Sequence, residues 1–262
     1  MDGDLRPGIA VRCTKTNCED AVGGNQVRRV YTRDPDAPDP VDLVQGSVAF
    51  VDDRSSVGLI NPLAGRRWRL EAEATMGSLC YVAVLADLRH YLYWNPFTLA
   101  LRGLHVARYG PDSETERATP LFLGYETYVR GYGVGSMRLG ECTPAAEYEC
   151  PEFQRLVGSK IAVAKAELRL PVLGIPGMSL QGTSFLPLTV LAFLDAGVAW
   201  TRDEPPVWKL ERDTVERVPV FSTGAAIRTA LGQLLVLEWS WAVPFQRPQE
   251  DLDFGFTITM GY

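Results

Sequence analysis

A regular alternation of apolar and polar residues runs through most of this chain. Between Arg67 and Met76 every second residue is apolar, and the residues between them are polar or charged. The same period of two recurs at residues 82–89, 160–170 and 253–262. Successive side chains of a β-strand point to opposite faces, so this pattern predicts strands with one apolar and one polar face. Helical periodicity is nearly absent, and we expect an all-β fold.

The alternation predicts nine strands and one weaker strand at residues 26–32. We place the nine at residues 43–53, 66–77, 80–91, 97–107, 159–171, 187–200, 218–230, 233–245 and 252–262. Many have about ten residues, which is the length of a tilted strand that crosses a membrane. Residues 108–157 are too many for an ordinary connection, so we expect a functional loop there.

Alternation alone does not distinguish a lipid-facing surface from the core of a soluble β-sandwich. Two features favour a membrane barrel. The polar faces carry charges of both signs, as a water-filled lumen tolerates. Aromatic residues also lie near strand ends, where membrane barrels place them at the two interfaces. These residues are Tyr91, Tyr93, Trp94, Trp200, Trp239, Trp241, Phe245 and Tyr262.

The composition argues against several other classes of protein. No apolar run approaches the ~18–20 residues that a membrane-spanning helix needs. The 26 basic and 32 acidic residues give a net charge of −6, without the basic stripe expected of a nucleic-acid-binding protein. The chain also lacks a Gly-x-Ser-x-Gly elbow, a Walker loop and a His-Glu-x-x-His motif. We therefore expect no enzymatic activity, no cofactor and no nucleic-acid partner.

Four of the five cysteines form two closely spaced pairs. Cys13 and Cys18 lie in a polar, turn-rich segment, and Cys142 and Cys150 lie within the long loop. Either pair could be a local disulfide in an oxidising compartment. Zinc is the alternative, but neither of the two histidines lies near a pair, so we expect no metal site.

The long loop contains the sequence Val129-Arg130-Gly131-Tyr132, referred to here as VRGY. Two of the strands predicted after it each carry a lone carboxylate on the polar face, Glu167 and Asp195. Arginine presents a planar fork of donors that two carboxylates can hold. The three residues therefore predict a loop pinned against the wall of a sheet. The alternative is a solvated Arg130 near a turn.

Asp195 belongs to the segment Phe193-Leu194-Asp195-Ala196-Gly197, an aromatic-x-Asp-x-Gly motif. This motif and the preceding VRGY loop resemble the Omp85 superfamily of outer-membrane barrels, which includes the bacterial surface-antigen and BamA/TamA-like barrels. The resemblance covers most of residues 43–262. It implies that Arg130 packs inside the barrel, with Asp195 and Glu167 as its partners.

The resemblance also gives expectations for the neighbours of Arg130. Gly131 would allow a backbone conformation or a close wall contact that a side chain forbids. Tyr132 would pack against the wall. The last strand resembles the C-terminal signal of outer-membrane barrels, with an apolar or aromatic residue at every second position. These residues are Phe254, Phe256, Ile258, Met260 and Tyr262.

The resemblance implies an antiparallel transmembrane β-barrel at residues 43–262, preceded by a polar segment, 1–42, with at most one strand. The family barrel has sixteen strands, and about nine or ten are present here, so we expect the C-terminal part of such a barrel. The start of the chain lacks the apolar core of a secretory signal, which also favours a fragment. A smaller closed barrel and pairing with another chain are the alternatives.

The function that the resemblance implies is assistance in inserting or translocating proteins at the bacterial outer membrane. The expected partners are outer-membrane lipid and client proteins, which would pair with a strand edge by β-augmentation. Two alternatives remain open. The chain could be a passive barrel anchor or pore for an upstream soluble domain, or it could be a soluble β-sandwich binding protein.

Overall fold

The structure is a computed structural model, and it divides into two units, Met1–Asp42 and Leu43–Tyr262. The residues that the structure describes are 10–14, 17–21, 30–31, 41–58, 60–133, 135–137, 141–142, 150–182, 186–212, 214, 216–231, 235–247 and 249–260.

The N-terminal unit contains three short strands, β1 (Ala10–Thr14), β2 (Asn17–Ala21) and β3 (Val30–Tyr31). Strand β1 pairs antiparallel with β2, where Cys13 lies opposite Cys18, and parallel with β3. The expectation of at most one strand was therefore wrong. Strand β3 lies within the weaker strand predicted at residues 26–32, but β1 and β2 are too short for alternation to reveal. The side chains of the two cysteines lie outside the described part of the chain.

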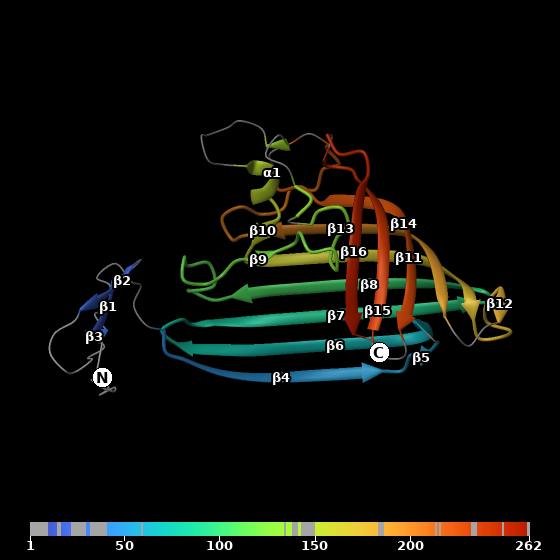
Figure 1. Ribbon diagram of the computed structural model, residues 1–262, viewed down its shortest axis with the longest axis horizontal. Helices are drawn as coiled ribbons and strands as arrows, with labels where there is room; N and C mark the ends of the chain where they lie inside the picture. Colours follow the sequence, from blue (N-terminus) through green and yellow to red (C-terminus); the bar gives the residue numbers. More distant parts are fainter. Residues whose placement is uncertain are drawn as a thin grey trace. The chain divides into compact units, whose positions relative to one another are not determined.

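The large unit is built on nine long strands that form one antiparallel sheet (Figure 1). They are β4 (Leu43–Asp53), β6 (Pro62–Gly77), β7 (Tyr81–Trp94), β8 (Phe97–Tyr109), β11 (Lys160–Gly174), β13 (Leu188–Trp200), β14 (Val220–Leu231), β15 (Leu235–Pro244) and β16 (Asp253–Met260). Each long strand pairs with the next long strand along the chain. The predicted all-β, antiparallel fold class is confirmed.

Among its described residues, the large unit also contains four short strands and one short helix. Strand β5 (Ser56–Val57) pairs with β6, and β12 (Gln181–Gly182) pairs with β11. Strand β9 (Leu121–Phe122) pairs with β10 (Val157–Gly158), just after the one-turn helix α1 (Pro151–Gln154). In the described part of the chain, no helix has the length and apolar character needed to cross a membrane.

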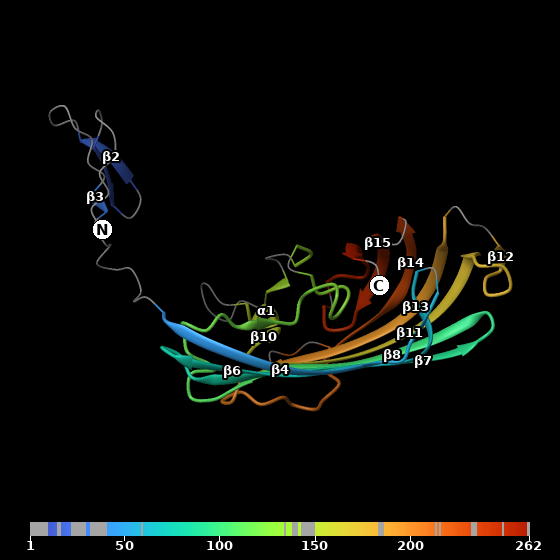
Figure 2. The same ribbon diagram turned by 90° about the horizontal axis from the view of Figure 1, so that it is seen from below.

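Seen edge-on, the sheet is a curved layer with a concave and a convex face (Figure 2). The connection between β8 and β11, residues 110–159, is called the VRGY loop. Its described segment around Arg130 lies on the concave side together with α1. The strand order begins at β4 and ends at β16, so these two strands are the edges of the sheet. The described strands therefore form an open sheet and not a closed barrel.

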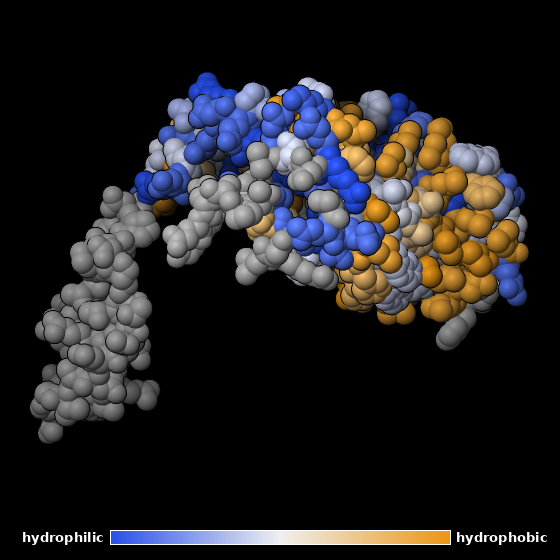
Figure 3. Space-filling view, turned by 90° about the horizontal axis from the view of Figure 1, so that it is seen from above, coloured by the Kyte–Doolittle hydropathy of each residue, from blue (hydrophilic) through white to orange (hydrophobic). Residues whose placement is uncertain are grey.

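The convex face of the sheet is apolar and exposed. The cross-strand register places Phe50, Leu70 and Ala86 side by side on this face. Other large exposed residues on it are Val48, Leu88, Leu101, Leu168, Leu194, Phe254, Phe256 and Ile258. Figure 3 shows apolar side chains gathered in a broad region of the surface. A soluble β-sandwich would cover such a face with a second large sheet. The only other sheet described within residues 43–262 is the β9–β10 pair, whose strands have two residues each.

The aromatic residues near strand ends divide between the two faces. Trp239 and Trp241 lie on the convex face, with ring centroids 5.4 Å from Phe256 and 5.9 Å from Phe254. Tyr91 is buried on the concave face, where the guanidinium of Arg169 lies 5.7 Å from its ring. The prediction of an interface role for Tyr91 was therefore wrong, because the strand alternation turns this residue toward the lumen side.

Candidate functional site

The VRGY loop is held on the concave face by an apolar cluster. Buried side chains of the loop pack against buried side chains of β8, β11, β13 and β14. The loop contributes Leu123, Val129, Tyr132 and Leu156, and the sheet contributes Leu104, Ile161, Val163, Ala199 and Val220. This cluster is the main core of the large unit, and it fixes the position of the backbone on either side of Arg130.

Arg130 lies at the centre of a buried set of ion pairs. Its Nε donates to Asp195 Oδ2 at 2.7 Å, and its Nη2 donates to Asp195 Oδ1 at 2.9 Å. Nη2 also donates to Glu167 Oε1 at 2.9 Å, and Nη1 donates to Glu238 Oε1 at 3.1 Å. Arg130 is 2% exposed and Asp195 is 0% exposed, so the structure does not show a solvated Arg130.

The environment of Arg130 stabilises its charge. Burial alone would lower the pKa of the guanidinium. The hydrogen bonds to Asp195 and the charges of Glu167 and Glu238 outweigh this effect, and they raise the pKa of Arg130 above its ordinary value. The arginine is therefore a permanent cation that three carboxylates share.

The aromatic-x-Asp-x-Gly motif meets the VRGY sequence at three successive positions on the concave face of β13. The Phe193 ring lies 3.7 Å from the guanidinium carbon of Arg130, in cation–π contact. Asp195, two residues along, accepts the hydrogen bonds of Arg130. At Gly197 a Cβ would approach Val129 Cγ2 to 2.7 Å. Alternate residues of one strand thus contact consecutive residues of the loop.

Gly131 and Tyr132 also contact the wall of the sheet. Gly131 has φ of +82°, and a Cβ there would lie 3.1 Å from the Cβ of Ala242 on β15. The hydroxyl of Tyr132 donates to Phe221 O and to Gln246 Oε1, each at 3.0 Å, and accepts from the backbone N–H of Gln246. Burial raises the pKa of the Tyr132 hydroxyl to about 12.

Further charges surround the carboxylates that hold Arg130. Glu167 accepts from Arg169 Nη2 at 2.7 Å and lies 3.3 Å from Arg228. Arg228 Nε donates to Glu238 Oε2 at 2.7 Å. Glu238 and Arg228 were not predicted as part of this site. Glu238 had the same signal as Glu167 and Asp195, because it is a lone carboxylate between apolar residues of a predicted strand.

A second connection reaches the same charged residues from the other end of the strands. Between β4 and β6 the chain turns back over the concave face at Ile60 and Asn61. Arg228 Nη1 donates to Asn61 Oδ1 at 2.6 Å, and Ile60 packs with Ala230 and Val236. No local pattern predicts this contact, because residues 61 and 228 lie 167 positions apart.

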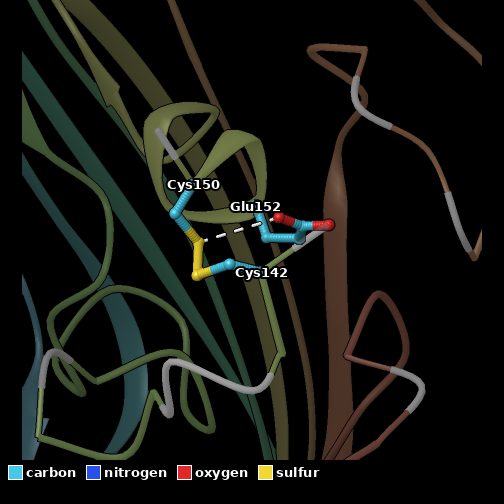
Figure 4. Close-up of side chains that lie close together, drawn as sticks. All are labelled: Cys142, Cys150 and Glu152. Carbon is cyan, nitrogen blue, oxygen red and sulfur yellow. Dashed lines mark hydrogen bonds between the residues drawn. A yellow bond between two sulfur atoms is a disulfide. The ribbon is translucent and has the colours of Figure 1, made fainter. Parts of the chain in front are cut away.

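The cysteines within the VRGY loop form a disulfide. The sulfur atoms of Cys142 and Cys150 are 2.12 Å apart, and Glu152 Oε2 lies 3.7 Å from the sulfur of Cys150 (Figure 4). These three residues are the only group in the described part of the chain with the spacing of metal ligands. Both sulfurs are bonded to each other, so neither is available as a thiolate ligand, and the group does not fit a metal site.

The last strand presents the predicted C-terminal pattern on the convex face. Phe254, Phe256, Ile258 and Met260 all lie among the exposed large apolar residues. Alternate residues of the strand face the concave side, where a Cβ at Gly255 would lie 2.9 Å from Glu126 Oε2 of the VRGY loop. Tyr262 lies outside the described residues.

A single antiparallel sheet with an exposed apolar face and a buried, arginine-bearing loop on its concave side has the architecture of an outer-membrane barrel wall. A family model, the Omp85 superfamily domain, matches residues 6–262, so the chain belongs to the Omp85 superfamily. Members of this family are outer-membrane proteins of bacteria, and the family is one of non-enzymatic barrels. No match was found among curated proteins.

Proposed function

We propose that this chain assists the insertion or translocation of proteins at the bacterial outer membrane. The observation that carries the proposal is the burial of Arg130 among carboxylates from three separate strands. Glu167 belongs to β11, Asp195 to β13 and Glu238 to β15. One side chain thus ties the VRGY loop to the half of the sheet that ends at the edge strand β16.

The mechanism follows from the position of this loop beside an open edge. The outer edge of β16 presents backbone donors and acceptors on which a strand of a client protein can pair. The loop contacts the two strands that lead to this edge, through Gly131 at Ala242 of β15 and through Glu126 at Gly255 of β16. A loop fixed in this way holds the edge in a conformation ready for pairing. The partners are client strands and outer-membrane lipid, and no cofactor takes part.

A passive anchor or pore has no need for a loop fixed at three strands, so we favour the assembly role typical of BamA- and TamA-like barrels. The test uses the full chain, reconstituted in lipid vesicles, and an unfolded outer-membrane protein as client. Protease protection of the client measures its insertion. Arg130→Ala should slow insertion at least tenfold, because it releases the loop from the sheet.

The matched control is Arg54→Ala, which removes the same charge from a side chain that is 71% exposed. It should leave the insertion rate unchanged. Both variants are checked for folding by the difference in gel migration between heated and unheated samples. Equal insertion by the two folded variants would contradict the proposed role of the loop.

A further inference from the structure

Four basic side chains form a row across the concave face, at directly opposed positions of neighbouring strands. Arg67 of β6 pairs in register with Arg89 of β7, Arg89 with Arg102 of β8, and Arg102 with Lys165 of β11. We call these four residues the cationic row. Like charges at opposed positions of a sheet destabilise it. The needs of the fold therefore do not explain the row.

Three carboxylates among the described residues contact the cationic row, and two of them are each shared between two cations. Asp53 lies 3.4 Å from Arg67, at one end of the row. Asp87 is shared between two of the four cations, Arg89 at 2.7 Å and Arg102 at 2.9 Å. At the other end Asp195 lies 3.3 Å from the lysine, but it also holds Arg130. An added anion would relieve the repulsion that remains along the row.

The cationic row lines a hollow of about 750 Å³ on the concave face. Six basic and four acidic side chains line this hollow, although the whole chain has a net charge of −6. Two more carboxylates, Asp87 and Asp195, contact the cationic row, so both signs of charge are present and four of the cations lie together in the row. Cations gathered in a partly enclosed hollow attract ligands of the opposite sign.

A polypeptide backbone already lies over one end of the row. The carbonyl oxygen of Thr127, in the VRGY loop, accepts from Lys165 Nζ at 3.3 Å and from Arg102 Nη1 at 3.5 Å. Neighbouring strands are about 4.8 Å apart, so the row spans roughly 14 Å. Acidic residues at alternate positions of an extended chain are about 6.7 Å apart, so three of them span the same distance. Guanidinium groups bind carboxylates through paired hydrogen bonds.

We propose that the cationic row binds acidic stretches of client polypeptides in an extended conformation as they cross the concave face. This inference rests on the proposed function and adds to it the class of client segment that the inner wall recognises. The row crosses four neighbouring strands, so a client segment whose acidic side chains bind it runs across the strands and not parallel to β16.

The test measures binding of a labelled peptide to the full chain in detergent micelles by fluorescence anisotropy. The probe is four Thr-Glu repeats, and the control peptide is four Thr-Gln repeats. The acidic peptide should bind at least tenfold more tightly, and its Kd should rise steeply with salt, because exposed charges are screened. Equal Kd values for the two peptides would overturn the proposal.

Two double variants distinguish the effect of the cationic row on binding from the effect of the overall charge. Arg67→Gln with Arg89→Gln should weaken binding of the acidic peptide at least tenfold. The control, Arg54→Gln with Arg69→Gln, also removes two charges, from side chains that are 71% and 55% exposed and belong to other ion pairs. It should change Kd less than twofold. An equal loss in both folded double variants would show that overall charge and not the row is responsible.

Two further measurements decide the source of the anion and separate this inference from the proposed function. Tripolyphosphate that displaces the peptide at concentrations below the peptide's own Kd would assign the row to phosphates and overturn the proposal. Insertion of a client by the wild-type chain, without binding of the acidic peptide, would remove the inference and leave the proposed function standing. Peptide binding without client insertion would contradict the proposed function and leave the binding of acidic segments by the row supported.

Discussion

Val129 occupies the space that Gly197 leaves open on the inner face of β13. A Cβ at position 197 would approach Val129 Cγ2 to 2.7 Å and Leu123 Cδ1 to 2.9 Å, both closer than van der Waals contact. The loop can therefore pack against the strand here because position 197 has no side chain. The same strand binds the next loop residue, Arg130, through Asp195.

Gly197→Ala should loosen the docked loop. The added methyl group must displace Val129 or Leu123, and overpacking of this kind costs about 1–3 kcal/mol. The midpoint of thermal unfolding in detergent and the rate of proteolysis within the VRGY loop measure the effect. Gly103→Ala is the control, because a Cβ there meets nothing within 4 Å. Equal changes in the two variants would exclude the contact as their cause.

Arg130→Lys should destabilise the loop although it keeps the charge. Lysine cannot reproduce the fork that binds both oxygens of Asp195 and reaches Glu167 and Glu238 at the same time. Disrupting a buried pair costs about 3–5 kcal/mol. Urea unfolding in detergent measures the loss. Arg54→Lys, at an exposed pair, should stay within experimental error, and a similar stability for both variants would contradict the prediction.

Tyr132→Phe should remove one late step from the alkaline titration of the protein. The chain has ten tyrosines, and the pKa of Tyr132 is raised to about 12 by burial. Because the folded state holds this proton more tightly, the stabilising contribution is complete below the ordinary pKa of about 10 and is lost as pH rises toward 12. Ultraviolet absorbance of tyrosinate follows the titration. Tyr125→Phe, at an exposed site, is the control. If this variant lost the same late step, the step would not belong to Tyr132.

Glu126→Gln should stabilise the docked loop at neutral pH. Burial and the nearby charge of Asp253 raise the pKa of Glu126, and its Oε2 has no hydrogen-bond partner in the described part of the chain. The protonated form is favoured in the folded state, so its stabilising contribution is lost as pH rises through the raised pKa. The wild-type loop should become easier to proteolyse from about pH 4 to neutral pH, and the variant should change less. Parallel pH profiles would refute this account.

The nine long strands were predictable because one face of each strand is apolar and the other is mostly polar, which gives the sequence a period of two. Alternation located β4 with its observed bounds and the other eight long strands within a few residues. It could not reveal β1 and β2, which are too short to show a period, whereas β3 lies within the weaker strand predicted at residues 26–32. The clustering of aromatic residues near strand ends misassigned Tyr91, because composition there does not say which face an aromatic side chain takes.

The candidate site was predictable where local motifs carry it. Arg130, Glu167 and Asp195 stand out in their segments, and the structure brings all three within hydrogen-bonding distance. Glu238 had an equivalent local signal but was not predicted. The contact between Asn61 and Arg228 depends on how far the β4–β6 turn reaches over the sheet, and no local pattern encodes that distance.

Arg228 is the residue on which the two inward-turning connections converge. It donates to Asn61 of the β4–β6 turn, and it also donates to Glu238, which accepts from Arg130. The turn comes from one end of the strands and the VRGY loop comes from the other. A displacement of either connection therefore changes the ion pairs that hold the other. The two connections are coupled through Arg228.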